Sequence, residues 1–172
     1  MSGITVNDRV FEDLKSKPSI KYVVMSSPFV QYVRQGATVL TKEGKVTLGH
    51  ERAYDALVAT ITRVKALGKI PVVFSPPPQN GENIGRCLMK AFLFGADESV
   101  CDVQLADSYT RQAEVYALLE KIGAIAPVVW LTEGLCSSHH CRASFEDVFV
   151  YRDDQHLSRE GRSYLGKQMD FY

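Results

Sequence analysis

Apolar residues recur along this chain at intervals of three and four, which is the spacing of amphipathic helices. The clearest stretch has apolar residues at positions 53, 57, 61, 64 and 67, followed by Gly68 as a natural helix stop. In the carboxyl-terminal tail, Ser158 can cap another helix. The pattern predicts helices in five places: from Val6 to a point before Pro18, 51–67, 84–94, 105–122, and the tail after Ser158.

Apolar runs rich in β-branched residues lie between these helices. Such runs are typical of strands that are buried on both faces of a sheet. The sequence predicts three of them, at 20–25, 70–75 and 126–131. The turn-rich stretch 36–49 is expected to hold a hairpin or loop tip at 41–45. Strands that alternate with amphipathic helices predict a three-layer α/β fold built on a mostly parallel sheet.

The ends of the predicted strands locate the expected binding edge. In sheets of this kind, ligands bind beyond the carboxyl ends of the strands. Here those ends are 26–28, 75–77 and 132–134. The first predicted element of the chain is a helix with no strand before it. We therefore expect residues 1–172 to form one partial domain that lacks its first part.

Composition narrows the class of protein. A length of 172 residues with 45% hydrophobic residues fits one globular domain. Lys plus Arg equals Asp plus Glu, 20 against 20, and no basic stripe stands out, which argues against a nucleic-acid partner. The longest apolar stretches, such as 124–131, fall far short of the roughly 18 to 20 residues that span a bilayer. No signal peptide opens the chain, so we expect any export signal or membrane anchor to lie outside it.

The four cysteines form two local pairs, Cys87 with Cys101 and Cys136 with Cys141. Disulfides, free buried thiols and a metal site are all open from spacing alone. Disulfides are favoured, because the adjacent His139 and His140 lack the separated ligand pairs of a zinc module. Two disulfides would indicate an oxidising compartment. No metal or cofactor is predicted.

The strongest chemical signal is the segment 151–158, in which Asp153 precedes His156 by three residues. An Asp at this spacing in a tight turn can aim its carboxylate at Nδ1 of the ring and leave Nε2 to take a proton from a nucleophile. A solvated loop that happens to contain both residues is the competing interpretation, because the pattern is short.

Several landmarks together resemble the SGNH hydrolase-like domain fused behind membrane-bound O-acetyltransferases that decorate bacterial polysaccharides. No landmark is specific alone, but their order and the final D-x-x-H block are moderately specific when taken together. They are the strand 72–74 running into 75–78, Arg86-Cys87-Leu88, the block 134–141, Tyr151-Arg152-Asp153, His156-Leu157-Ser158, and Gly161.

The resemblance implies a flavodoxin-like SGNH fold and a Ser-His-Asp triad that includes Asp153 and His156. It implies acyl transfer or ester hydrolysis on acetyl groups of cell-surface carbohydrate, with an acyl donor and an upstream membrane acyltransferase domain as partners. It also implies a periplasmic domain of an inner-membrane protein, in agreement with the interpretation of the cysteines.

The chain departs from the family at the nucleophile. Members of the family carry a Gly-Asp-Ser motif after the first strand, and this sequence contains no such motif. The family's G-x-N-D motif is also missing from this sequence. The tripeptide most similar to Gly-Asp-Ser is Ala-Asp-Ser at 106–108, which is expected on a helix surface. Ser26 and Ser27 follow a predicted strand and are candidates for a substitute nucleophile, for substrate binding or for the oxyanion site. We expect the first strand or strands and the serine to lie outside this chain, which by itself would be inactive.

Two rival functions remain. One is a non-catalytic carbohydrate-binding or partner-docking domain that kept the fold without the serine. The other is a soluble α/β enzyme that uses Ser26 or Ser27. The expected loss of neighbouring strands would also leave the edge of strand 20–25 open, which predicts a homodimer through that edge.

Overall fold

The computed structural model describes residues 3–41 and 44–171. The chain forms two compact units, and each is described by itself. Unit 1 comprises Met1–Phe74 and Glu114–Val129, and unit 2 comprises Ser75–Ala113 and Trp130–Tyr172. The expectation of one domain over 1–172 stays a prediction.

Unit 1 is built on a parallel sheet of three strands. Its strands are β1 (Tyr22–Ser26), β4 (Ile70–Phe74) and β6 (Val128–Val129), in the order β1-β4-β6. Val24 lies opposite Val72, and Val73 lies opposite Val128. Helices lie on both sides of this sheet, so the predicted α/β class is confirmed.

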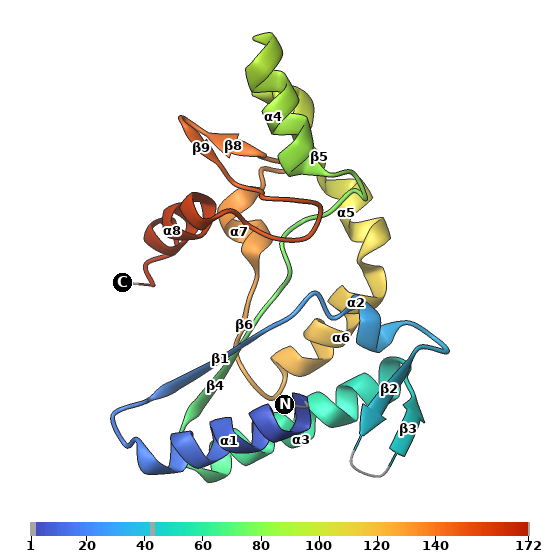
Figure 1. Ribbon diagram of the computed structural model, residues 1–172, viewed down its shortest axis with the longest axis vertical. Helices are drawn as coiled ribbons and strands as arrows, with labels where there is room; N and C mark the ends of the chain where they lie inside the picture. Colours follow the sequence, from blue (N-terminus) through green and yellow to red (C-terminus); the bar gives the residue numbers. More distant parts are fainter. Residues whose placement is uncertain (1–2, 42–43, 172) are drawn as a thin grey trace. The chain divides into compact units, whose positions relative to one another are not determined.

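Helices and a hairpin complete unit 1 (Figure 1). The elements are α1 (Gly3–Ser16), α2 (Val30–Val33), β2 (Thr38–Thr41), β3 (Gly44–Thr47), α3 (His50–Ala66) and α6 (Ala113–Gly123). Buried positions on α3 include Ile61 and Val64, and those on α6 include Leu119 and Ile122. These positions recur at helical spacing, so each helix buries one apolar face. The hairpin β2–β3 confirms the predicted turn region, whose residues 42 and 43 lie outside the described part.

Two strand predictions need correction. The strand at 20–25 was expected to be buried on both faces, yet Tyr22 and Val24 of β1 are exposed. The reason is that β1 pairs only with β4 among the described residues and stands at the edge of the sheet. The strand at 126–131 is reduced to β6, because α7 (Leu131–Leu135) already begins at Leu131. The expected strand end at 132–134 is therefore helical.

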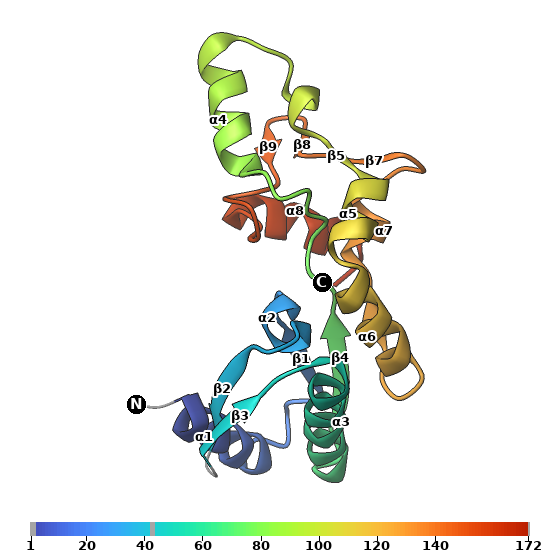
Figure 2. The ribbon, with the colours of Figure 1, turned by 90° about the vertical axis from the view of Figure 1, so that its right-hand side faces the viewer.

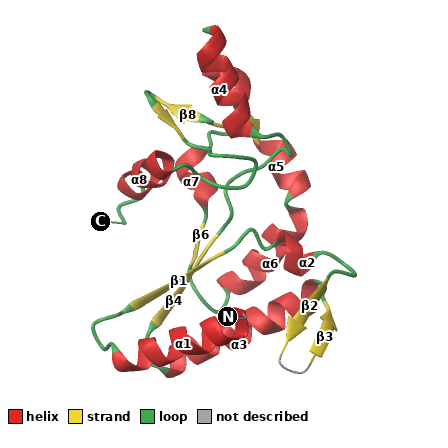
Figure 3. Ribbon diagram, viewed as in Figure 1, coloured by secondary structure: helices red, strands yellow, loops and turns green. Residues whose placement is uncertain are grey.

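Unit 2 contains short helices and very short strands joined by long loops (Figures 2 and 3). Its further elements are α4 (Ile84–Phe94), the 3₁₀ helix η1 (Glu98–Cys101), β5 (Val103–Gln104), α5 (Leu105–Arg111), β7 (His140–Cys141), β8 (Ser144–Phe145), β9 (Val148–Phe149) and α8 (Arg159–Gln168). The bounds of α4 agree with the prediction. The Oγ of Ser158 accepts the Gly161 N–H at 2.7 Å, which confirms the predicted cap of α8.

The helix predicted at 105–122 is in fact two helices. Helix α5 ends at Arg111, and Gln112 follows as its C-cap. The side chain of Gln112 forms hydrogen bonds with backbone groups that are distant in sequence. Its Oε1 accepts the Gln79 N–H at 3.1 Å, and its Nε2 donates to the Pro77 carbonyl at 3.2 Å. Ser108, expected on a helix surface, is helical but fully buried, and its hydroxyl donates to Gln112 at 2.8 Å. A buried polar network replaces the expected continuous helix.

All four cysteines are in disulfides, Cys87–Cys101 and Cys136–Cys141, which confirms the disulfide prediction. The first links α4 to η1, and the second closes the loop before β7. Among residues 3–41 and 44–171, no helix has the length and apolar character needed to cross a bilayer.

Candidate functional site

The segment between β9 and α8 is a closed turn. Tyr151 and Leu157 form an isolated antiparallel bridge, and the Arg152 N–H donates to the His156 carbonyl at 2.9 Å. Ser158 then begins α8 as its cap. The D-x-x-H segment is thus fixed at both ends by backbone hydrogen bonds.

Within this turn, the carboxylate of Asp153 faces the ring of His156. Its two oxygens lie 2.9 and 3.0 Å from Nδ1. Because an ionised carboxylate can only accept hydrogen bonds, the proton must lie on Nδ1. The acceptor lone pair of the neutral ring is therefore on Nε2. The structure brings the two predicted residues together in the geometry of a base and its orienting acid.

The carboxylate of Asp153 is itself held by the turn. Its Oδ1 accepts the backbone N–H groups of Gln155 at 2.9 Å and His156 at 2.8 Å. Its Oδ2 accepts hydrogen bonds from Nε and Nη2 of Arg152, both at 3.1 Å. The acid is thus preorganised before any substrate binds.

These contacts also control ionisation. Burial acts to raise the pKa of Asp153, but hydrogen bonds from Gln155, His156 and Arg152 outweigh it and hold that pKa well below its ordinary value. The carboxylate therefore stays ionised at neutral pH and can stabilise a protonated imidazole.

The ring of His156 is open to incoming groups. Its side chain is 55% exposed. In the described part of the chain, no hydrogen bond to Nε2 is found. An open Nε2 beside a fixed Nδ1–carboxylate contact is the arrangement that a general base requires.

Two contacts that the sequence did not reveal position this turn. The hydroxyl of buried Tyr151 donates to the Pro78 carbonyl at 3.0 Å. Gly85, in the first turn of α4, lies so close to the backbone of Arg152 that a Cβ there would come within 2.1 Å of its carbonyl oxygen. The one sequence feature that could have indicated the Tyr151 contact is the run of prolines at 76–78. Prolines lack N–H groups, so this run cannot form a regular ladder and its carbonyls take side-chain donors.

Ser26 and Ser27 belong to unit 1, whereas Asp153 and His156 belong to unit 2. Ser26 ends β1 and is exposed, and the Oγ of Ser27 accepts the Phe29 N–H at 3.3 Å. Neither hydroxyl is hydrogen-bonded to an imidazole within the described residues. Their roles as nucleophile or oxyanion donors stay predictions.

His140 of the Cys136–Cys141 loop belongs to a separate cluster of polar side chains. The Oγ of Ser137 lies 3.4 Å from Nδ1 of His140, and the opposite ring nitrogen of His140 is 3.8 Å from a carboxylate oxygen of Asp102. No group of three or more His, Cys, Asp or Glu residues within 3–41 and 44–171 could hold a metal ion.

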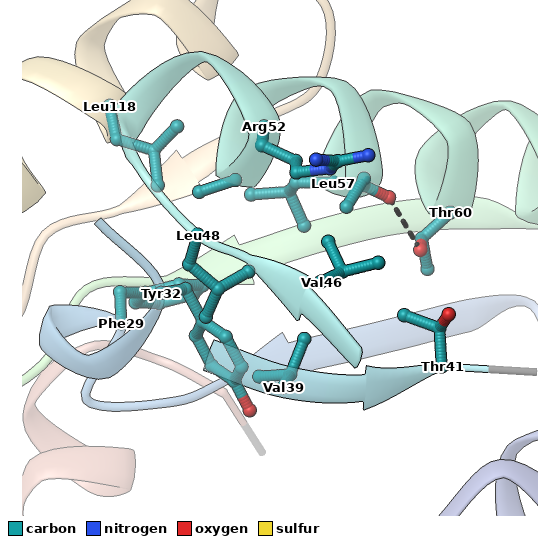
Figure 4. A pocket seen from close by; sticks show the side chains of 12 residues that line it. Phe29, Tyr32, Val39, Thr41, Val46, Leu48, Arg52, Leu57, Thr60 and Leu118 are labelled. Atoms are coloured by element: carbon teal, nitrogen blue, oxygen red, sulfur yellow. Dashed lines mark hydrogen bonds between the residues drawn. The ribbon is translucent and has the colours of Figure 1, made fainter. Parts of the chain in front are cut away.

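Unit 1 contains an apolar pocket of about 400 Å³ (Figure 4). Its walls come from α2, the β2–β3 hairpin, α3 and Leu118 of α6. Arg52 is the one charged residue among its described lining residues, which include neither a carboxylate nor an imidazole. This pocket therefore offers no acid–base pair, and the candidate site is the turn of Asp153 and His156.

Residues 3–171 match the family of SGNH domains that are fused to AT3 domains, and the chain belongs to this family. A similar solved structure is the periplasmic domain of a lipopolysaccharide acetyltransferase from Salmonella serovar Paratyphi A, with a TM-score of 0.64 at 16% sequence identity. The similarity covers 99% of this chain and 63% of that structure, and it supports an SGNH-like α/β fold. A comparison with curated proteins found no match.

Proposed function

We propose that this chain is the acid–base part of an acyl-transfer domain that acts on acetyl groups of cell-surface carbohydrate. The observation that carries the proposal is the contact of the Asp153 carboxylate with Nδ1 of His156, at 2.9 and 3.0 Å. Membership of the SGNH family and the fold shared with a lipopolysaccharide acetyltransferase domain support it. Two disulfides fit a periplasmic location.

In the proposed reaction, a serine hydroxyl attacks the carbonyl carbon of an acetyl donor while Nε2 of His156 takes the hydroxyl proton. Asp153 holds the ring and stabilises its protonated form. The donor's leaving group departs with the proton from His156. A sugar hydroxyl then attacks the acyl-enzyme, again through His156, and the serine is released. Water in place of the sugar would give hydrolysis.

We further propose that the serine is supplied by polypeptide outside these residues, next to a membrane acyltransferase domain. The sequence contains no Gly-Asp-Ser, and the chain corresponds to 63% of the similar structure. This proposal is tested by labelling the 172-residue chain with a fluorophosphonate. No labelling is expected. Labelling that Ser26→Ala or Ser27→Ala removes would place the nucleophile within the chain instead.

The general-base role is tested with His156→Ala in the full-length acetyltransferase. Acetyl transfer should fall by roughly a thousandfold or more, because proton removal from the serine is lost. The matched control is His139→Ala, which removes an exposed imidazole from the disulfide loop and should leave turnover unchanged. Unchanged turnover in His156→Ala would contradict the proposal and favour a carbohydrate-binding or docking role.

A further inference from the structure

A shallow groove lies between the two elements that flank the turn of Asp153 and His156. Strand β9 leads into this turn and α8 follows it (Figure 1). The groove has a volume of about 280 Å³ and belongs wholly to unit 2. We call it the β9–α8 groove. It is lined by Val148 of β9 and by one stripe of α8, which consists of Arg159, Glu160, Ser163, Tyr164 and Lys167.

Backbone contacts fix this groove beside the turn. The N–H of Ser158, the cap of α8, donates to the Val150 carbonyl at 2.8 Å. Gly161 packs so closely on Val150 that an added Cβ would overlap its backbone. Val150 directly precedes the turn, so the start of α8 is held against the end of β9. Arg159 follows His156 by three positions, which limits their Cα separation to about 11 Å.

Tyr164 gives the groove an aromatic wall. Its ring stacks on the ring of Phe145 in β8, with centroids 4.7 Å apart and planes inclined by 21°. The guanidinium carbon of Arg142 lies 4.6 Å from the centroid of Phe145 on the same stack. Stacking of this kind fixes the orientation of an aromatic ring. The groove therefore has a rigid, flat wall before any ligand binds.

Charged side chains of both signs surround this wall. Arg159, Glu160 and Lys167 are exposed, and no ion pair or side-chain hydrogen bond of theirs is found within residues 3–41 and 44–171. They offer two groups that donate and one that accepts. A pyranose ring has an apolar face of C–H groups and hydroxyls that both donate and accept. A flat aromatic wall with free charged donors and acceptors beside it matches these properties, and hydrogen bonds to charged groups are the stronger ones.

We propose that the β9–α8 groove is a subsite for a sugar residue of the carbohydrate that accepts the acyl group. This assignment rests on the proposed function, because it concerns the acceptor of that reaction. The C–H face of the sugar packs on Tyr164, and its hydroxyls bind Arg159, Glu160 and Lys167. Binding there holds the acceptor chain next to the turn, so that another of its hydroxyls can reach the acyl-enzyme at His156.

The subsite is tested first by binding to the 172-residue chain, which requires no serine. Methyl glycosides of glucose, galactose, mannose and rhamnose are titrated and followed by NMR. At least one should shift the amide signals of β9 and α8, with a dissociation constant of about 1 mM. Tyr164→Leu should weaken this binding roughly tenfold, whereas Tyr164→Phe keeps the ring and should weaken it less than about threefold.

The charged part of the subsite has its own variant and a matched control. Arg159→Gln with Lys167→Gln should weaken glycoside binding roughly tenfold, because two charged donors are lost. Arg162→Gln is the control: it removes an exposed positive charge from the same helix, outside the groove, and should leave binding unchanged. In the full-length protein, with the tightest-binding glycoside as acceptor, Tyr164→Leu should raise the acceptor KM roughly tenfold and lower kcat less.

Three outcomes would overturn the subsite. They are absence of glycoside binding, binding that the variants at Tyr164, Arg159 and Lys167 do not weaken, and saturable binding of inorganic phosphate that glycosides do not displace. The last result would assign the groove to an anionic ligand. Failure of the proposed function has a different signature, since it appears as unchanged acetyl transfer in His156→Ala, whatever the groove binds.

Discussion

The two units of this chain are stabilised by different kinds of interaction. Unit 1 has a sheet with helices that bury apolar faces, with Ile61, Val73 and Ile122 at most 1% exposed. Unit 2 has strands of only two residues, and it contains both disulfides and the network of Gln112 with Gln79 and Pro77. Both units bury apolar side chains, with Leu88, Val103 and Val150 of unit 2 fully buried, but unit 2 adds directional and covalent links to this packing.

The proposed function gives one reason for this difference. Apolar packing is enough to hold the β1-β4-β6 sheet of unit 1 rigid. If the turn of Asp153 and His156 aims an imidazole as proposed, it needs contacts with defined directions. Asp153, Tyr151 and Gly85 supply such contacts in unit 2. Perturbing one unit should therefore leave a different signature from perturbing the other.

The largest effect on stability is expected from Ile61→Ala in unit 1. The side chain is almost fully buried, so the loss of packing and the cavity should lower the free energy of unfolding by about 3–4 kcal/mol. Urea denaturation measures this, with the exposed Val24→Ala of β1 as a control that should change it by less than about 0.5 kcal/mol. An effect of Ile61→Ala as small as the control would contradict apolar packing as the main support of unit 1.

Removing the disulfide of α4 should break unit 2 selectively. Cys87→Ser with Cys101→Ser opens a link with a sequence separation of 14, which should cost about 3 kcal/mol in chain-entropy terms. The matched control is Cys136→Ser with Cys141→Ser, separation 5, for which about 2 kcal/mol is expected. Hydrogen exchange should accelerate in α4 and η1 before it does in α3. Equal acceleration in both units would count against the comparison.

Gly85→Ala tests whether α4 positions the reactive turn. The added Cβ would lie 2.1 Å from the Arg152 carbonyl oxygen, so the turn must shift, at a cost of about 1–3 kcal/mol. Gly123→Ala is the control, because a Cβ there meets nothing within 4 Å. If the full-length protein has the proposed acyl-transfer activity, we expect kcat to fall more than KM rises. A stability loss with unchanged kcat would show that Gly85 serves packing alone.

The smallest effect concerns pH. The folded pKa of Asp153 lies below its unfolded value, so its contribution is present above about pH 4 and is lost as pH falls through the folded pKa. Asp153→Asn should therefore reduce stability at neutral pH by about 1 kcal/mol or less, and the difference from the parent should shrink below about pH 4. Urea titrations over that range measure it. A difference that does not change with pH would place the stabilisation in hydrogen bonding rather than in charge.

Local patterns in the sequence predicted the local structure well. The helix α4, the cap at Ser158 and the contact between Asp153 and His156 each depend on residues a few positions apart. Helical periodicity and the i,i+3 spacing in a turn contain this information directly. The α/β class followed from the same periodicities.

Features that depend on distant residues were not predictable in this way. Helix 105–122 is periodic throughout, but its break at Gln112 comes from bonds to Gln79 and Pro77, more than thirty positions earlier. The exposure of Tyr22 reflects the place of β1 at the edge of the sheet, which no local pattern encodes. The packing of Gly85 on Arg152 is equally remote in sequence.

The hydrogen bonds inside the closed turn have a consequence for protein engineering. Asp153 is fixed by its own neighbours, Arg152, Gln155 and His156, within five consecutive residues. The hydrogen bonds that orient the imidazole thus lie within one short peptide segment, whereas Tyr151 and Gly85 hold that segment in its unit. Such a segment is portable: grafted between a strand and a capped helix of another scaffold, it should carry its oriented histidine with it.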